Sequence, residues 1–209
     1  MSRGGTPGRS YGAAVLVAGL VALVGASGVA AGTAASSCPS RALTTPFLPW
    51  GDRDLYFLAT DGSMESTASW ALTGGAKRVA GNETFYVNSP LDRNSLYLPY
   101  GSSARTASMC VTIHSPTLRL FVRNTGSAAS ALKVEVLFTD RFGFRRSVAV
   151  AALTGSSSWK PSPAVLFLNL IAPLLGAGET TWVSFRFSPM GWGGSWQIDD
   201  LYVDPLKMG

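Results

Sequence analysis

Acidic residues gather in two short segments near opposite ends of the globular part of the chain. The first, residues 61–65, contains Asp61 and Glu65, and the second, near the C-terminus, contains the neighbouring aspartates Asp199 and Asp200. A Ca²⁺ ion takes about six to eight oxygen ligands, which usually come from several backbone stretches. If the first and last strands of a sheet brought the two segments together, their carboxylates could share such a cation.

Aromatic and arginine side chains form a second pattern, which is suited to holding a sugar. Trp182 and Arg186 share one face of a predicted strand, and in another strand Arg119 and Arg123 flank Phe121. Aromatic rings offer stacking surfaces, and arginines donate charge-assisted hydrogen bonds. These five residues are the candidate ligand-binding set. The alternative is that the aromatic residues fill the core or a sheet face, which is their commoner role in small sandwiches.

The sequence carries no catalytic motif. His114 has no second histidine with which to bind a metal, and no Gly-x-Ser-x-Gly nucleophile motif occurs. A glycosidase needs only two carboxylates at a set separation, which sequence does not measure. The glutamates that this leaves open are Glu65, Glu83, Glu135 and Glu179. Charged residues make up only 14% of the chain and do not cluster, so we expect a protein that is not an enzyme.

The N-terminus has the layout of a secretory signal peptide. Residues 1–12 carry two arginines and no acid, residues 13–24 are small and apolar, and residues 25–37 are rich in Ala, Gly and Ser. The apolar run is too short to cross about 30 Å of hydrocarbon comfortably. We expect residues 1–35 to be cleaved and the remainder to be secreted or held at the cell envelope. An uncleaved anchor is the alternative, because the small residues that follow could lengthen the span; the membrane would then be contacted only through this segment.

Charge excludes one class of partner. Without residues 1–35 the basic residues fall from 17 to 15 while the 12 acidic residues remain, so the mature net charge is +3. The only adjacent basic pairs are Lys77-Arg78 and Arg145-Arg146. A nucleic-acid surface needs a basic patch or stripe, so no nucleic-acid partner is expected.

Both cysteines, Cys38 and Cys110, lie in the part of the chain that would be exported. In an oxidising compartment we expect them to form one disulfide that ties the N-terminal tail to the strand at residues 109–113. Two alternatives carry less support: a reactive Cys110 beside His114 lacks a third orienting group, and an acylated Cys38 lacks the usual preceding leucine.

Alternation of apolar and polar residues predicts an all-β protein. Residues 118–123, 133–138 and 182–187 alternate with period two, which places one face of each strand in a core. Shorter candidate strands are residues 54–59, 70–73, 84–87, 95–98, 109–113, 144–150, 165–170 and 196–203. Many short strands separated by Gly and Pro, with no amphipathic helix between them, favour an antiparallel β-sandwich, and a jelly roll first.

The expected organisation has three parts. They are the signal peptide at 1–35, an N-terminal extension at 36–52 tied by the disulfide, and the β-sandwich domain at 53–209. Within the sandwich, the apolar residues 165–175 fit either a buried strand or a short helix, because periodicity does not separate the two.

The two acidic segments resemble the first and last strands of jelly-roll carbohydrate-binding modules. Residues 61–65 read Asp-Gly-Ser-Met-Glu with Trp70 five positions on, and residues 198–203 read Ile-Asp-Asp-Leu-Tyr-Val. Such modules often open with Asn-Gly-Asp-Phe-Glu and often end with Ile-Asp-Asp-Val. Nearly the whole mature chain, from Cys38 onward, also resembles a group of secreted actinobacterial proteins of uncharacterised activity.

The resemblance to these modules implies a structural calcium site. Glu65 and Asp199 match the acidic residues of the motif, and Asp61 and the backbone around Ser63 are further candidate ligands. Asp199 and Asp200 are neighbours on one strand, so they are expected to point to opposite faces, and one of them to bind. Asp199 is preferred because the first acid is the more regular one. The alternative is that these acids are solvated or paired with arginines.

Two functions from different classes follow from these observations. The first is a secreted, non-catalytic binding module for a cell-wall or extracellular polysaccharide. The second is a structural or interaction protein of the cell envelope without affinity for sugar. Retention on polysaccharides, or indifference to them, separates the two.

Overall fold

The computed structural model describes residues 38–112, 117–176, 178 and 180–204, all of which fall within one compact unit, Ala35–Gly209. The expected signal peptide, His114 and Glu179 lie outside these residues. No helix in the described ranges is long and apolar enough to cross a membrane.

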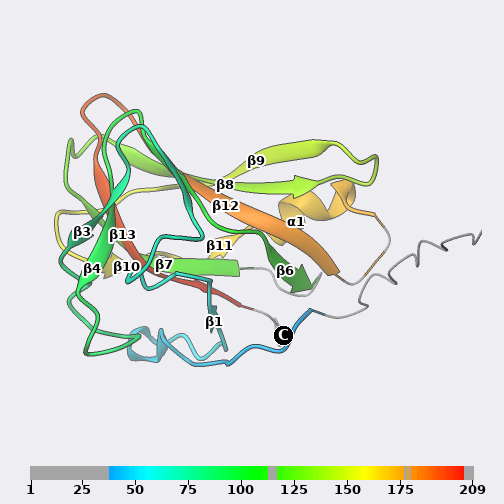
Figure 1. The fold of residues 1–209 in the computed structure, drawn as a ribbon, viewed down its shortest axis with the longest axis horizontal. Coiled ribbons are helices and arrows are strands. Elements are labelled where there is room, and N and C mark those ends of the chain that lie inside the picture. Colours follow the sequence, from blue (N-terminus) through cyan, green and yellow to red (C-terminus); the bar gives the residue numbers. More distant parts are fainter. Residues whose placement is uncertain (1–37, 113–116, 177, 179, 205–209) are drawn as a thin grey trace, which may run out of the picture. The chain divides into compact units, whose positions relative to one another are not determined.

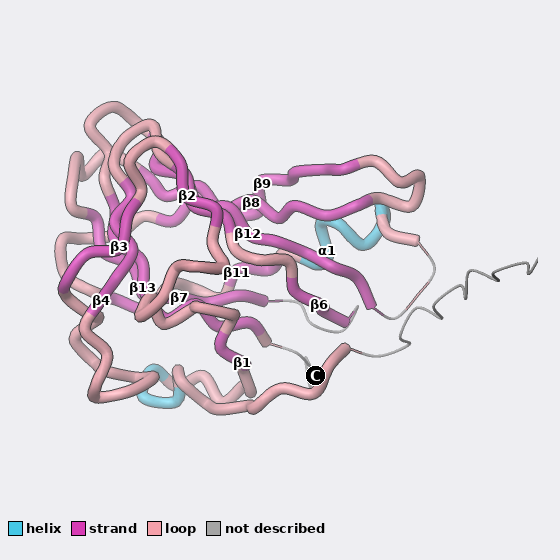
Figure 2. The backbone as a smooth tube through the Cα atoms, viewed as in Figure 1, coloured by secondary structure: helices cyan, strands magenta, loops and turns pink. Residues whose placement is uncertain are grey.

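Two antiparallel sheets make up the described part of the chain, as the alternation predicted (Figure 1). The first sheet contains β1 (Phe57–Leu58), β3 (Lys77–Ala80), β4 (Asn94–Leu98), β7 (Thr117–Asn124), β10 (Lys160–Pro161), β11 (Val165–Leu166) and β13 (Trp196–Val203). The second contains β2 (Ala71–Thr73), β5 (Ser103–Arg105), β6 (Met109–Thr112), β8 (Ala131–Thr139), β9 (Arg145–Leu153) and β12 (Thr180–Met190). The connections between them are mostly loops (Figure 2).

The order of the strands places β13 and β12 inside their sheets. The first sheet runs β10, β7, β13, β4, β3, with β1 also pairing with β13 and β11 with β7. The second runs β2, β5, β12, β8, β9, with β6 also pairing with β12. Many neighbours in a sheet are therefore distant in sequence, which is the architecture expected of a jelly roll rather than of a simple meander.

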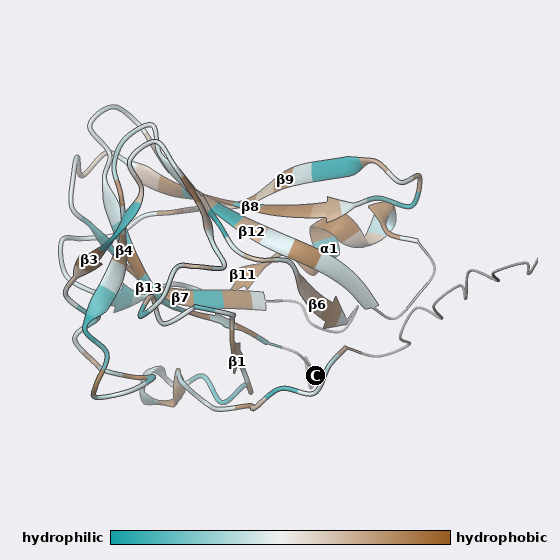
Figure 3. Cartoon of the chain, viewed as in Figure 1, coloured by the Kyte–Doolittle hydropathy of each residue, from teal (hydrophilic) through white to brown (hydrophobic). Residues whose placement is uncertain are grey.

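The main core lies between the two sheets and confirms the predicted register. Hydrophilic and hydrophobic residues alternate along β12 (Figure 3). The residues expected to face inward are all buried, namely Leu118, Leu120, Val122, Val183, Phe185 and Phe187. Since a slip of one residue would turn every side chain to the other face, the position of this set in the core between the sheets establishes the inward face of β7 and that of β12.

A second core covers the outer face of the first sheet. It consists of Phe47, Tyr56, Phe121, Trp159 and Tyr202, each at most 5% exposed. The ring of Phe47 stacks on that of Phe121 at a centroid distance of 5.6 Å. Phe47 precedes the short 3₁₀ helix η1 (Leu48–Trp50), so it is the N-terminal extension that closes this face.

The predicted disulfide is confirmed. Cys38 and Cys110 are bonded, with their Cα atoms 5.4 Å apart, so the extension is fastened to β6 at its start. It is also held further along, because the backbone N–H of Thr44 donates to the carbonyl of Tyr56 and that of Tyr56 donates back.

The short strands β3, β5 and β10 were not predicted, one predicted strand is wrong, and the segment left open between strand and helix contains both. Residues 84–87 form a loop instead of a strand: the Glu83 carboxylate accepts the N–H groups of Phe85 and Val87, and Tyr86 has φ of 51°, which an extended strand does not allow. Residues 165–175 resolve into β11, the short helix α1 (Leu168–Ile171) and the 3₁₀ helix η2 (Ala172–Leu174).

Candidate functional site

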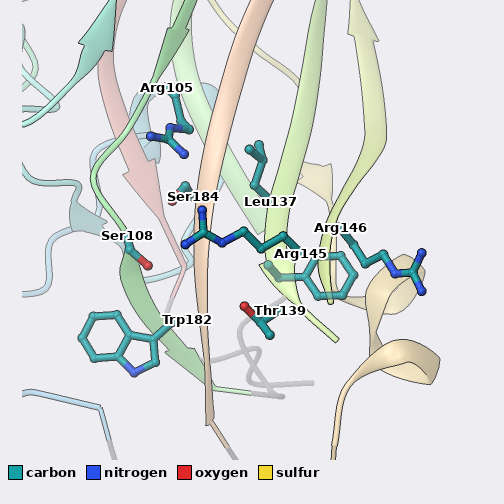
Figure 4. A pocket seen from close by; sticks show the side chains of 9 residues that line it. Arg105, Ser108, Leu137, Thr139, Arg145, Arg146, Trp182 and Ser184 are labelled. Carbon is teal, nitrogen blue, oxygen red and sulfur yellow. The ribbon is translucent and has the colours of Figure 1, made fainter. Parts of the chain in front are cut away.

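An open groove runs across the outer face of the second sheet. Its volume is about 370 Å³, and it lies over β5, β12, β8 and β9 (Figure 4). Side chains alternate along a strand, so burial of Val183 and Phe185 turns Trp182 and Ser184 outward into the groove. The lining residues are Arg105, Ser108, Leu137, Phe138, Thr139, Arg145, Arg146, Trp182 and Ser184.

Trp182 supplies the aromatic surface of this groove. It is 58% exposed, although it lies on a strand that pairs on both sides, with Cys110 opposite it on β6. An indole ring costs solvation free energy when it is left in water, and a flat apolar ring beside polar side chains is suited to stacking on a sugar. Trp182 is therefore exposed, and its role in binding a ligand stays a prediction.

Arg186 belongs to the same face but is held by the protein itself. Its Nε and one terminal nitrogen each donate to Glu135 at 2.8 Å, and Lys133 lies 3.2 Å from the same carboxylate. Hydrogen bonds from Arg186, and next those from Lys133, lower the pKa of Glu135 to about 2 against burial. Glu135 is therefore an ionised partner in a salt-bridge network. Arg186 is part of this network and is not one of the residues that line the groove.

Three arginines that line the groove, Arg105, Arg145 and Arg146, were not predicted as ligand residues from the sequence. Arg105 comes from the short strand β5, and Arg145 opens β9 across from Thr139. Arg145 had been noted only as one member of an adjacent basic pair. The pairing of β8 with β9 could have identified Arg145 as a residue of this face. Arg145 lies opposite Thr139, and residues directly opposite each other in an antiparallel pair share one face of the sheet.

The other three predicted ligand residues do not form an exposed face, and that part of the prediction is wrong. Arg119, Phe121 and Arg123 lie on β7, in the first sheet, and not beside Trp182. Phe121 is 0% exposed and Arg119 is 9% exposed. The outward register was right, but the second core covers the face.

Each of the two arginines on β7 contacts residues of the protein that pack on the outer face of the first sheet. The Arg119 guanidinium lies 4.2 Å above the ring of Phe47 and forms an ion pair with Asp52. That of Arg123 lies 5.0 Å from the ring of Trp159 and donates to the side-chain oxygen of Gln197. Both residues therefore attach segments of the protein to the first sheet.

The two acidic segments do lie side by side, as expected. The N–H of Leu201 donates to the carbonyl of Gly62, and the N–H of Ala59 donates to the carbonyl of Leu201. A side chain at Gly62 would place its Cβ 2.8 Å from the carbonyl oxygens of both Ala59 and Leu201, so only glycine permits this approach. Glycine at 62 is thus what lets the early loop contact β13.

The carboxylates of the early loop are occupied by hydrogen bonds. Glu65 accepts from the N–H groups of Arg93 and Asn94 and from the Asn94 side chain, and Asp61 accepts from the N–H of Ser69. These donors favour the ionised form, and the pKa values of both acids are lowered, that of Asp61 chiefly by the Ser69 N–H and that of Glu65 despite burial.

Asp199 and Asp200 contact the same loop, so the expectation that they point to opposite faces is wrong. The N–H of Glu83 donates to Asp199 and the N–H of Asn88 donates to Asp200. The register of β13 against β7 shifts between Asp199 and Tyr202, and Asp200 has φ of 45°. A bulge of this kind breaks the alternation of an ideal strand.

Burial disfavours the ionised forms of Asp199 and Asp200. Both are 0% exposed. Burial, and then the charge of Asp200, raises the pKa of Asp199 to about 9. Burial, and then the charges of Glu83 and Asp92, raises the pKa of Asp200 to about 7.

The predicted calcium ligands do not converge in the described residues, and calcium binding stays a prediction. In the described residues no three acidic, histidine or cysteine side chains come together as a metal-binding group, so the four predicted acids are not assembled as one ligand set. Asp200 nevertheless keeps one buried carboxylate oxygen without a hydrogen-bond partner, and Glu83, Asp92 and Glu65 all raise its pKa by their charge. A single cation beside Asp200 would satisfy that oxygen.

Comparison with known proteins identifies the fold. A scan of protein-family models and a search of curated proteins both give no match. Among solved structures, the tandem CBM22-1-CBM22-2 domain of Paenibacillus barcinonensis Xyn10C matches with a TM-score of 0.51 and 12% identity, over 83% of this chain and 48% of that chain. A likeness at this level of identity establishes the jelly-roll fold and not the ligand.

Two further solved structures are similar at lower scores. The CBM22-1 xylan-binding domain of the same Xyn10C gives a TM-score of 0.47 and 14% identity, over 69% of this chain and 90% of that chain. TmCBM61, solved with β-1,4-galactotriose, gives 0.41 and 17%, over 70% of this chain and 96% of that chain.

Proposed function

We propose that this protein is a non-catalytic binding module for a polysaccharide, and that the ligand lies in the groove on the outer face of the second sheet. The observation that carries the proposal is Trp182, an indole ring 58% exposed beside polar side chains in a groove of about 370 Å³. That volume is at the lower end of the range for small-ligand sites, which suits one stretch of an extended chain.

The chemistry expected of the groove is recognition and not bond cleavage. Hydrolysis of a glycosidic bond needs two carboxyl groups on either side of it. Within the described residues, none of the side chains that line the groove is acidic, and the neighbouring Glu135 is neutralised by Arg186 and Lys133. Trp182 would stack on a sugar ring, while Ser108, Thr139 and Ser184 would donate or accept hydrogen bonds at its hydroxyl groups.

The test is retention on insoluble polysaccharides and purified cell wall, with the Trp182→Ala variant beside the wild type. Trp192 is a matched control, because it is 86% exposed and lies beyond the opposite end of β12 from Trp182. The proposal predicts retention of the wild type and of Trp192→Ala, and loss of at least about tenfold in affinity for Trp182→Ala, a range typical of a base or ring stacked on an aromatic side chain. Indifference of the wild type to every glycan would favour a structural or interaction protein of the envelope instead.

We also propose that a Ca²⁺ ion has a structural role beside Asp200. The unpartnered Asp200 oxygen would be a ligand, with backbone carbonyls and water completing the oxygen set that Ca²⁺ prefers. The ion would supply positive charge among Glu65, Glu83, Asp92 and Asp200. A ligand that binds only the folded state adds about 2.7 kcal/mol to the stability at a hundredfold excess over Kd.

Thermal unfolding with Ca²⁺ against chelator tests this second proposal. The wild type should melt at a higher temperature with Ca²⁺, and Asp200→Asn should lose the difference. Asp54→Asn is the control, because Asp54 is exposed and precedes β1. Equal melting temperatures with Ca²⁺ and chelator in the wild type would contradict a calcium site.

Export remains part of the proposal, and it is supported by the sequence of the first 35 residues and by the disulfide, which persists in oxidising compartments. The mass of the protein recovered from the culture medium should correspond to cleavage near residue 35. An intact N-terminus in the membrane fraction would instead show an anchor.

A further inference from the structure

Arginines dominate the polar lining of the groove. Arg105, Arg145 and Arg146 all line it, and among the described residues no acidic side chain does. Figure 4 shows Arg145 reaching across β12 beside Ser184, with Arg105 on one side of it and Trp182 on the other, while Arg146 points the other way. Two guanidinium groups and one indole ring therefore face the same short stretch of the groove.

These two guanidinium groups differ from the other arginines nearby in having no internal partner. Arg146 donates to Asp140 at 2.7 Å, and Arg186 is paired with Glu135. In the part of the chain that the structure describes, the side chains of Arg105 and Arg145 form no ion pair or hydrogen bond, and both residues are exposed.

No residue in the described ranges therefore neutralises their charges. Like charges held on one face raise the local positive potential, and that potential attracts an anion. Glu135, on β8, and Asp140, directly after β8, already form ion pairs with other cations. Because the balance around Arg105 and Arg145 stays positive, a ligand that carries its own negative charge would complete the site.

We infer that the groove recognises an acidic polysaccharide, with the carboxylates of its uronic-acid units bound by Arg105 and Arg145 and a sugar ring stacked on Trp182. The inference rests on the proposed function and specifies its ligand class. The planar guanidinium fork matches a carboxylate in two parallel hydrogen bonds, which a lysine would not provide. The indole selects a polymer with apolar ring faces over one with a flexible acyclic backbone.

The experiment compares one polymer in two charge states. The probes are polygalacturonate and the same polymer after reduction of its carboxyl groups, with xylan as a further neutral polymer, each tested by affinity electrophoresis and calorimetry. The wild type should bind polygalacturonate at least about tenfold more tightly than its reduced form, and added salt should weaken that binding because exposed charges are screened.

Variants test whether Arg105 and Arg145 cause the preference for the acidic polymer. The double variant Arg105→Gln/Arg145→Gln should lose the preference for the acidic polymer by at least about tenfold while keeping its residual affinity for the reduced form. The control is Arg53→Gln/Lys77→Gln, which removes the same charge from two exposed residues, one before β1 and one on β3. The control should bind as the wild type does, and circular dichroism should show both variants folded.

The outcomes separate this inference from the proposed function. Equal affinity for the two charge states would overturn the uronic-acid assignment and leave a glycan-binding groove. An equal loss in the Arg53/Lys77 control would show that net charge alone is responsible and would also overturn it. No binding to any of the polymers would overturn both.

Discussion

Removal of the disulfide should destabilise the protein chiefly through its unfolded state. The change is Cys38→Ser together with Cys110→Ser. The bond joins residues 72 positions apart, and closing a loop of that length in the unfolded chain corresponds to about 4 kcal/mol in the chain-entropy account. The native extension should stay in place, because Phe47 is 0% exposed in the second core and Arg119 pairs with Asp52.

Urea unfolding of the wild type and the double variant measures this effect. The free energy of unfolding should fall by about 3 to 5 kcal/mol, and the m-value should rise, because an unfolded chain without the cross-link exposes more surface. The near-UV spectrum of the native state should not change. Reduction of the wild type in the native state should give the same loss as the two substitutions.

Two results would refute the reasoning. A loss below about 1 kcal/mol with an unchanged m-value would mean that the unfolded chain is not restrained by the bond. A loss accompanied by an altered near-UV spectrum would mean that the bond holds the native extension in place, and that Phe47 and Arg119 do not.

Three further substitutions test the electrostatics and the second core. Hydrogen bonds from Arg186 lower the pKa of Glu135 from 4.5 to about 2, so Glu135 adds stability above pH 4.5 that is lost as the pH falls towards 2. Between pH 4.5 and pH 2 the free energy of unfolding in urea should therefore fall by up to about 3 kcal/mol more for the wild type than for Glu135→Gln. Parallel curves of this free energy against pH would contradict the ion pair. Burial raises the pKa of Asp200 from 3.8 to about 7, so in chelator the folded state keeps a proton on Asp200 that the unfolded state has lost. The melting temperature should therefore fall as the pH rises from 4 to 7, and Asp200→Asn should flatten that profile. A melting temperature that rises with pH in the wild type would contradict the raised pKa of Asp200. Phe47→Ala should cost about 3 to 5 kcal/mol in urea unfolding, whereas a loss below about 1 kcal/mol would mean that the extension is not part of the core.

Local pattern was sufficient for the fold class and for much of the register. Leu118, Leu120 and Val122 alternate with polar or aromatic residues, so they lie on one face of the strand, and that face is the one in the main core. The disulfide followed from the count of two cysteines. The contact between the early acidic loop and β13 followed from the resemblance of two short motifs, and Gly62 supplies its steric reason.

The binding face could not be deduced in the same way. Phe121 was expected outside because it alternates with the core residues of β7, and it does point outward, but Phe47 covers it from 74 positions earlier in the chain. Alternation specifies which face a side chain takes within its own strand. It carries no information about which distant segment packs on that face.

Period-two alternation and the cysteine count can be read without knowing the fold, and they were enough to predict the all-β class, the inward faces of β7 and β12, and the disulfide. The packing of distant segments established which outer face stays open, that Arg105 and Arg145 lie beside Trp182 without an ion pair in the described residues, and that Asp199 and Asp200 contact one loop. The physical reason is that these groups come from strands whose order in the sheet does not follow their order in the chain, and that a bulge at Asp200 departs from ideal alternation.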